Sequence, residues 1–134
     1  MILLIDNAGS FTHSLARAFA EAGAEIKPVR PGEVQENDIV NASAVVVATG
    51  PDDQNALETN IQIVRNIDVQ TPVLGIGLGM RALIEAYGGQ FVASDNPGIG
   101  LADEIIHDET TIFEGVPSPL VVGRYDAMLL DEDS

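Results

Sequence analysis

The sequence predicts an α/β fold, in which helices cover both faces of a mostly parallel sheet. Residues 2–5 and 44–48 are short, uninterrupted apolar runs, typical of strands buried on both faces of such a sheet. Each run is followed by polar turn residues and then by apolar residues at helical spacing. Strands that alternate with helices indicate parallel pairing, because each crossover returns the chain to the same end of the sheet.

The first ninety residues divide into strands and helices in alternating order. We expect strands at 2–5, 24–29, 44–48 and 72–76, and helices at 12–22, 55–66 and 79–87. Thr12 is expected to cap the first helix, and Pro28 confines its strand to an edge or an end because it lacks a backbone donor. Residues 31–41 are polar, which predicts an irregular segment.

After Gln90 the pattern changes to short strand-like pieces separated by turn residues. The turns are expected at 96–98, at 114–117 and at Gly123. We expect short antiparallel strands in this C-terminal third, as hairpins appended to the parallel sheet. The pieces are 91–93, 103–107, 110–113, 120–122 and 127–130. The length of 134 residues suits a single domain, 1–134.

The charge balance excludes several classes of partner. The chain has 21 Asp and Glu against 6 Lys and Arg, a formal net charge of −15. Binding to a nucleic-acid backbone needs clustered basic residues, so neither nucleic acid nor an anionic membrane is an expected partner. A hydrophobic content of 46% argues against an acidic disordered tail. Excess acid on a folded domain is a device of halophiles, so we predict a halophilic protein; an acidic mesophile with a basic partner is the alternative.

Several chemistries and locations are excluded by what the sequence lacks. The sequence contains no cysteine, so disulfides, thiolate metal sites and cysteine nucleophiles are excluded. We expect neither a cofactor nor a bound metal. The first residues carry no basic region or cleavage site, and no apolar run has the length of a membrane span. A cytoplasmic protein is therefore predicted.

The segment 72–80, Pro-Val-Leu-Gly-Ile-Gly-Leu-Gly-Met, is the most informative for function. A strand meets a helix across one tight turn, the geometry of a nucleophile elbow, where a strained backbone aims a side chain at the top of a sheet. The helix N-terminus would also offer backbone N–H groups to a developing anion. Gly75-x-Gly77-x-Gly79 superficially matches a dinucleotide loop, but Met80 occupies the position of the last glycine, so that match fails.

Five segments together carry a resemblance to a known family: 4–12, 72–79, 88–89, 108–119 and 124–125. They resemble class I glutamine amidotransferases, especially the glutaminase subunit of anthranilate and aminodeoxychorismate synthases. Met80 is closer to the archaeal GMP-synthase glutaminases, which share the fold. The resemblance covers nearly the whole chain and implies a flavodoxin-like architecture of the class I amidotransferase type.

Departures from the family pattern bear on catalysis. The resemblance puts Gly77 where the family has its cysteine, which attacks the glutamine amide to form a thioester. Asp52 replaces a glycine of the oxyanion loop. Neither His13 nor His107 matches the catalytic histidine, and the family's segment carrying that histidine and its glutamate has no counterpart, so we expect a domain truncated at the C-terminus. No catalytic residue is predicted.

The remnant of the oxyanion loop and pocket supplies the candidate binding residues. They are Gly50, Asp52, Gly77, Leu78 and Met80. Two interpretations stay open: a structural remnant without a ligand, and a pocket that binds without reacting. Asp52 and Asp53, with Asp6, could hold a hard cation, or form a solvated acidic rim.

The sequence therefore predicts a non-catalytic amidotransferase-like protein that acts as a binding or regulatory subunit. The alternatives are a glutaminase subunit that supplies ammonia from glutamine to a synthase, and a decayed gene product. A synthase-type subunit or a second copy of the chain is the expected partner. The family docks through a His-Gly-Lys stretch that falls near the apolar residues 99–101 here, which argues against docking on a standard chorismate enzyme.

Overall fold

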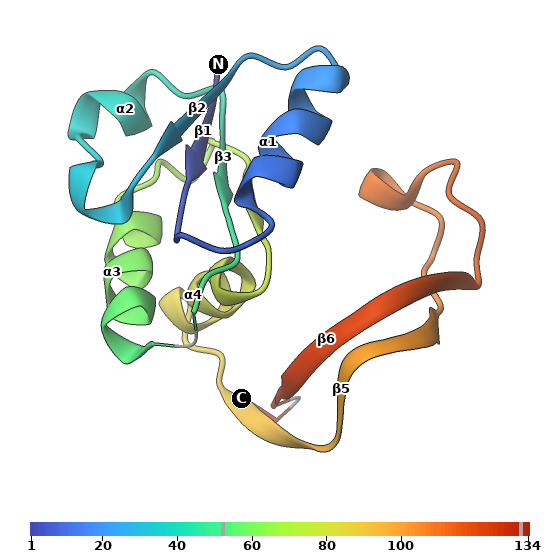
Figure 1. Cartoon of the computed structure of the whole chain (residues 1–134). Coiled ribbons are helices and arrows are strands. Elements are labelled where there is room, and N and C mark those ends of the chain that lie inside the picture. The colour runs from blue at the N-terminus through green and yellow to red at the C-terminus, as the bar shows by residue number, and fades with distance from the viewer. Residues whose placement is uncertain (52, 132) are drawn as a thin grey trace. The chain divides into compact units, whose positions relative to one another are not determined.

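The protein divides into two compact units, drawn in Figure 1. The computed structural model describes residues 1–51, 53–131 and 133–134. The first unit comprises Met1–Gln90 together with Ser134, and the second comprises Phe91–Asp133. That the whole chain behaves as one domain stays a prediction.

The first unit contains a four-stranded parallel sheet. Its strands are β1 (Ile2–Ile5), β2 (Ile26–Val29), β3 (Ala44–Val47) and β4 (Val73–Gly75), arranged in the order β2-β1-β3-β4. All three pairings are parallel, which confirms the predicted sheet. The strands β1 and β3 lie in the centre, where continuous apolar runs are expected. Pro28 lies on β2 at the edge, as its missing N–H requires.

Helices cover both faces of this sheet, as predicted, and are α1 (Thr12–Glu21), α2 (Glu36–Val40), α3 (Gln54–Arg65) and α4 (Leu78–Ala86). Alternate residues of each central strand point to opposite faces. On one face Leu4 and Val46 pack with Phe19 of α1. On the other face Leu3 and Val45 belong to a cluster that includes residues of α2, α3 and α4.

Two predictions for the first unit are wrong. Thr12 does not cap α1: Phe11 takes the N-cap position without a side-chain cap, and Thr12 is the buried first helical residue. The chain already turns before it, where the Thr12 N–H donates to the carbonyl of Gly9. Residues 31–41 are not irregular, because they form a 3₁₀ turn (Pro31–Glu33) and the helix α2. A capping box between Gln35 and Asp38 stabilises that short helix.

The second unit consists of a two-stranded antiparallel sheet and a connecting segment. Its strands are β5 (Phe91–Ile105) and β6 (Leu120–Leu130), with a 3₁₀ turn (Thr111–Phe113) between them. The expected antiparallel strands are confirmed, but they form one pair of long strands and not several short hairpins. The predicted turn at 96–98 lies inside β5, where a register shift absorbs the extra residues, and Gly123 lies inside β6.

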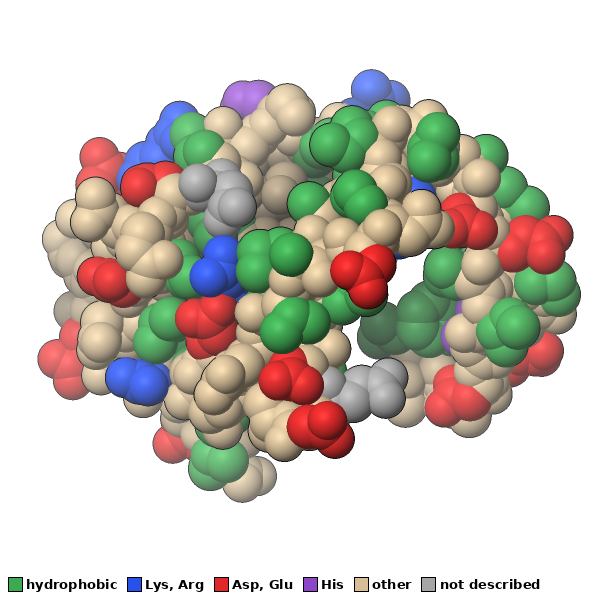
Figure 2. Space-filling model, turned by 90° about the horizontal axis from the view of Figure 1, so that it is seen from below, with side chains coloured by type: hydrophobic (Ala, Val, Ile, Leu, Met, Phe, Trp, Pro, Cys, Tyr) green, Lys and Arg blue, Asp and Glu red, His purple; other side chains and the backbone are tan. Residues whose placement is uncertain are grey.

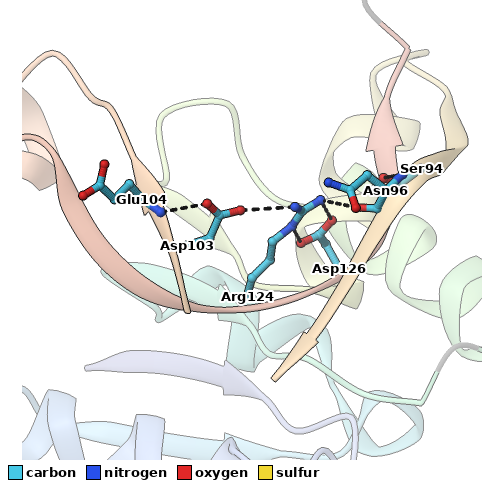
Figure 3. A network of polar contacts seen from close by, with 6 residues as sticks. All are labelled: Ser94, Asn96, Asp103, Glu104, Arg124 and Asp126. Carbon is cyan, nitrogen blue, oxygen red and sulfur yellow. Dashed lines mark hydrogen bonds and ion pairs between the residues drawn. The ribbon is translucent and has the colours of Figure 1, made fainter. Parts of the chain in front are cut away.

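Arg124 joins the two strands of the second unit through carboxylates and a carbonyl (Figure 3). Its Nε and one terminal nitrogen donate to the two carboxylate oxygens of Asp126, at 2.6 and 3.0 Å. The terminal nitrogen that contacts Asp126 also donates to the Asn96 carbonyl at 2.6 Å, and the other terminal nitrogen donates to Asp103 across the sheet at 3.2 Å. Gly98 leaves room for this side chain, since a Cβ there would lie 2.6 Å from Arg124 Cδ.

Among the residues that the structure describes, every helix is too short to traverse a lipid bilayer. The longest, α3, has 12 residues. Acidic side chains are spread over the face drawn in Figure 2, where basic side chains are few.

Candidate functional site

Gly50 and Gly77 lie in loops at one edge of the parallel sheet, beside the loop that holds Asn7. These loops follow β1, β3 and β4, and the carboxyl ends of parallel strands meet at the same edge, where doubly wound folds bind ligands. The Asn7 side chain, in the first loop, donates to the carbonyl of Ala48 at the end of β3, at 2.8 Å. Gly50 packs directly on it, since a Cβ on Gly50 would lie 2.5 Å from the Cβ of Asn7.

Gly77 forms the sharp turn between β4 and α4 that the motif predicted. Its φ is +59° and its ψ is −115°, in the left-handed half of conformational space that L side chains rarely adopt. It occupies the N-cap position of α4. A Cβ at this position would lie 2.5 Å from Thr49 Oγ1 and 2.9 Å from Thr49 Cβ. The Thr49 side chain therefore fills the space into which a residue at the elbow would project.

The other predicted positions are only partly brought together. Leu78 lies against Gly50: its Cδ2 is 3.2 Å from the position that a Cβ on Gly50 would take. The Leu78 side chain is buried in an apolar cluster with Leu57 and Ala82. Met80 is exposed on α4. Asp52 lies outside the described residues. Gly50 thus lies against Asn7 and Gly77 against Thr49, two polar residues that the sequence analysis did not select.

Asn60 is a further site residue that sequence reasoning missed. It is completely buried on α3 and exchanges hydrogen bonds with Asn7, which ties α3 to the loop after β1. A signal was present in the sequence, because Asn60 falls between Leu57 and Val64 on the apolar face of its helix. An amide on such a face requires a buried polar partner.

Asp53 and Asp6, two of the three acidic residues considered for a cation, are engaged by the protein itself. Asp53 is the N-cap of α3, where its carboxylate accepts from the N–H groups of Asn55 and Ala56. The carboxylate of Asp6 accepts from the Ala8 N–H and pairs with Arg30 at 3.4 Å. Across residues 1–51, 53–131 and 133–134 no group of three His, Cys, Asp or Glu is arranged to hold a metal ion.

Both histidines lie away from the elbow motif in the sequence. His13 is exposed on α1. His107 was expected in a strand at 103–107, but it lies beyond the end of β5. Its ring stacks on the ring of Phe113, with the ring centroids 4.5 Å apart. Its Nδ1 accepts from the Glu109 N–H and its Nε2 contacts the Pro117 carbonyl, which fixes the loop between the strands.

A family model described as glutamine amidotransferase class-I matches residues 3–134. The chain belongs to the class I glutamine amidotransferase family. It is 32% identical to aminodeoxychorismate synthase component 2 of Escherichia coli (strain K12), over all of this chain and 73% of that protein. It is 31% identical to anthranilate synthase component 2 of Pseudomonas aeruginosa, over all of this chain and 68% of that protein. The resemblance inferred from the motifs is confirmed.

Solved structures confirm the flavodoxin-like fold expected of the family. A GMP synthase protein from Thermoplasma acidophilum superposes with a TM-score of 0.84 at 22% identity, over 98% of this chain and 66% of that one. A glutamine amidotransferase from Thermotoga maritima superposes with a TM-score of 0.74 at 21% identity, over 97% of this chain and 61% of that one. The chain thus spans somewhat less than two thirds of these two proteins.

Proposed function

We propose that this chain is a non-catalytic class I amidotransferase domain that acts as a binding or regulatory subunit. One observation carries the proposal: the elbow between β4 and α4 is retained, but it holds Gly77, and the Thr49 side chain fills the space beside it. The family's reaction requires a sulfur nucleophile at the elbow. A glycine has no atom that can attack an amide, and no cysteine is present elsewhere in these 134 residues.

The polar groups beside the elbow support a structural use of the pocket. The hydrogen bonds of Asn7 are directed at Ala48 and Asn60, and the backbone around Gly50 packs against Asn7. Thr49 Oγ1 lies 2.5 Å from the position that a Cβ on Gly77 would take. A hydroxyl without an adjacent base is a weak nucleophile, so Thr49 is an inadequate replacement for a thiolate.

The relatives favour a second candidate function. They are named as component 2 of aminodeoxychorismate or anthranilate synthase. A glutaminase subunit that supplies ammonia from glutamine to a synthase partner is therefore the alternative. With either function, the proposed partner is a synthase-type subunit, and a homodimer is the alternative assembly. We also propose that the protein is cytoplasmic, as the sequence predicted.

Glutamate release from glutamine separates the two functions. The purified chain is incubated with glutamine, alone and with a synthase subunit of the family, beside an active class I glutaminase as positive control. We expect no release above the protein-free rate. The Thr49→Val variant, which keeps the shape of the side chain but removes the hydroxyl, is the matched control. Release that the wild type performs and this variant loses would overturn the proposal.

Association is measured on the same samples by light scattering. A complex with the synthase subunit that forms without glutamine turnover supports a binding or regulatory subunit. A chain that neither turns over glutamine nor associates with the synthase, in low or high salt, would contradict that role.

A further inference from the structure

Both ring nitrogens of His107 are bound within the segment that connects β5 to β6, residues 106–119, which we call the connecting segment. The Nδ1 atom accepts from the Glu109 N–H at 3.1 Å, and the Nε2 atom lies 3.1 Å from the carbonyl oxygen of Pro117. A backbone N–H can only donate and a carbonyl can only accept. The two contacts together therefore require a neutral ring whose proton is on Nε2, because a ring protonated at both nitrogens would lose the bond from Glu109.

His107 makes two further contacts in the connecting segment. Its backbone N–H donates to Ser118 Oγ at 3.1 Å, and its ring stacks on the ring of Phe113 at an interplanar angle of 16°. The connecting segment is thus attached to His107 near both of its ends and at its 3₁₀ turn. The His107 side chain is only half-buried, so protons from the solvent reach the ring.

The hydrogen bond from Glu109 to the ring falls on a strained part of the backbone. Glu109 has φ +57° and Thr111 has φ +53°, in the left-handed region that residues other than glycine rarely adopt. Thr111 is β-branched, and for such a residue this conformation is an outlier. Strained conformations persist only where surrounding contacts hold them. The conformation of the connecting segment therefore depends on contacts such as the bond between Glu109 and the His107 ring.

The charged residues that adjoin His107 along β5, the connecting segment and β6 are carboxylates. Residues 104–121 contain no Lys or Arg, and their acidic residues are Glu104, Asp108, Glu109 and Glu114. Hydrogen bonds from the backbone and side chain of Thr110, together with the charge of His107, hold the pKa of Asp108 below its ordinary value of 3.8. The Asp108 carboxylate thus keeps its charge over the range, about pH 8 to 5, in which histidine side chains gain a proton. A protonated ring that leaves Glu109 has an anionic partner beside it.

We propose that His107 is a pH-sensitive switch that closes and opens the connecting segment. The neutral ring accepts from the Glu109 N–H and holds the left-handed backbone in place. A proton on Nδ1 breaks that bond, so the segment is closed at the upper end of histidine's titration range and opens as the pH falls through it. The inference concerns the second unit alone, goes beyond the proposed function and does not depend on it.

Backbone NMR relaxation of the isotope-labelled full chain, at about pH 8 and pH 5 in constant salt, tests the switch. We expect order parameters of about 0.85 for residues 109–113 at pH 8, as in rigid backbone, and values below about 0.6 at pH 5. Long-range proton–nitrogen correlation spectra of the His107 ring report its tautomer directly. At pH 8 they should show the proton on Nε2, as the contacts with Glu109 and Pro117 require.

The two histidines of the chain provide a matched pair of variants. His107→Asn removes the titratable ring but keeps a side-chain oxygen that can accept from the Glu109 N–H, as asparagine does in Asx turns. His13→Asn makes the same substitution at an exposed position of α1, in the first unit. We expect the order parameters of residues 109–113 to be independent of pH in His107→Asn and to fall as in the wild type in His13→Asn. His13→Asn leaves His107 as the one histidine of the sequence, so the test does not depend on whether His107→Asn folds.

Four outcomes would overturn the proposal. They are a wild-type connecting segment as rigid at pH 5 as at pH 8, a fall in order parameters that persists in His107→Asn, a fall that is lost in His13→Asn, and a ring proton on Nδ1 at pH 8. A connecting segment that is already mobile at pH 8 in His107→Asn and does not change with pH supports the switch, because it shows that the ring is required for the closed conformation.

Discussion

The side-chain amides of Asn7 and Asn60 exchange two hydrogen bonds across 53 positions of sequence. Asn60 Nδ2 donates to Asn7 Oδ1 at 2.7 Å, and Asn7 Nδ2 donates to Asn60 Oδ1 at 3.2 Å. Both residues are buried, and each also donates to a backbone carbonyl, of Ala48 or of Ala56. The pair fixes the loop after β1 on α3, beneath the candidate site.

Asn60→Ala is expected to lower the free energy of unfolding by about 1–3 kcal/mol, since it leaves the amide of Asn7 buried and partly unpaired. Urea denaturation at constant salt measures this cost. Asn66→Ala is the matched control, because exposed Asn66 also donates to the carbonyl four residues earlier. A cost at Asn60 no larger than at Asn66 would show that the buried pair contributes nothing.

Gly77→Cys is expected to lower the free energy of unfolding of the first unit. The left-handed backbone at this position accounts for about 1–3 kcal/mol, and the steric contact of the new side chain with Thr49 adds to that cost. Gly23→Ala is the control for the backbone alone, because Gly23 has φ +86° and no atom within 4 Å of its Cβ position. Thr49→Ala should relieve part of the Gly77→Cys penalty, which a double-mutant cycle in urea measures. Additive effects would contradict steric filling of the elbow by Thr49.

Acid is expected to loosen the second unit through Asp126. The hydrogen bond from Arg124 holds the pKa of Asp126 below its ordinary value of 3.8. The unfolded chain therefore binds more protons in this range, and stability rises with pH. The Asp126 carboxylate makes its full contribution to the free energy of unfolding above its ordinary pKa. That contribution is lost as the pH falls through the lower pKa that Asp126 has in the folded protein.

Urea midpoints between about pH 2 and 5 should accordingly rise less steeply in Asp126→Asn than in the wild type. Arg124→Gln removes the cause of the pKa shift and should flatten the same range. Parallel curves for all three proteins would contradict this assignment.

Salt is expected to stabilise the protein. The net charge of −15 makes the folded state repel itself, and at 1 M salt the Debye length falls to about 3 Å, which screens that repulsion. Tm should rise with KCl, as predicted for a halophilic protein. Chloride salts are preferred to sulfate, since sulfate also strengthens apolar burial. A Tm that is unchanged or lower in KCl would favour an acidic mesophile protein.

Local sequence patterns were sufficient for the parallel sheet and its layers. Apolar runs predicted β1 and β3 within one residue, because both faces of these strands are buried and little else in a fold requires such runs. After Gln90 the same patterns predicted antiparallel strands but not their bounds. Strand β5 is long and largely exposed, so burial leaves no clear period in its residues, and a bulge hides its continuity. Burial does alternate along β6, but apolar residues occur on both of its faces.

The sequence by itself determined the family and the tight elbow at Gly77, because these depend on residue identity at fixed spacing. Only the tertiary structure decided what surrounds that glycine. Thr49 and Asn60 reach the site from other elements, and contacts between residues distant in sequence leave no periodic signal. Which side chains of β5 and β6 share a face was likewise decided by pairing, because the register of the two strands determines it.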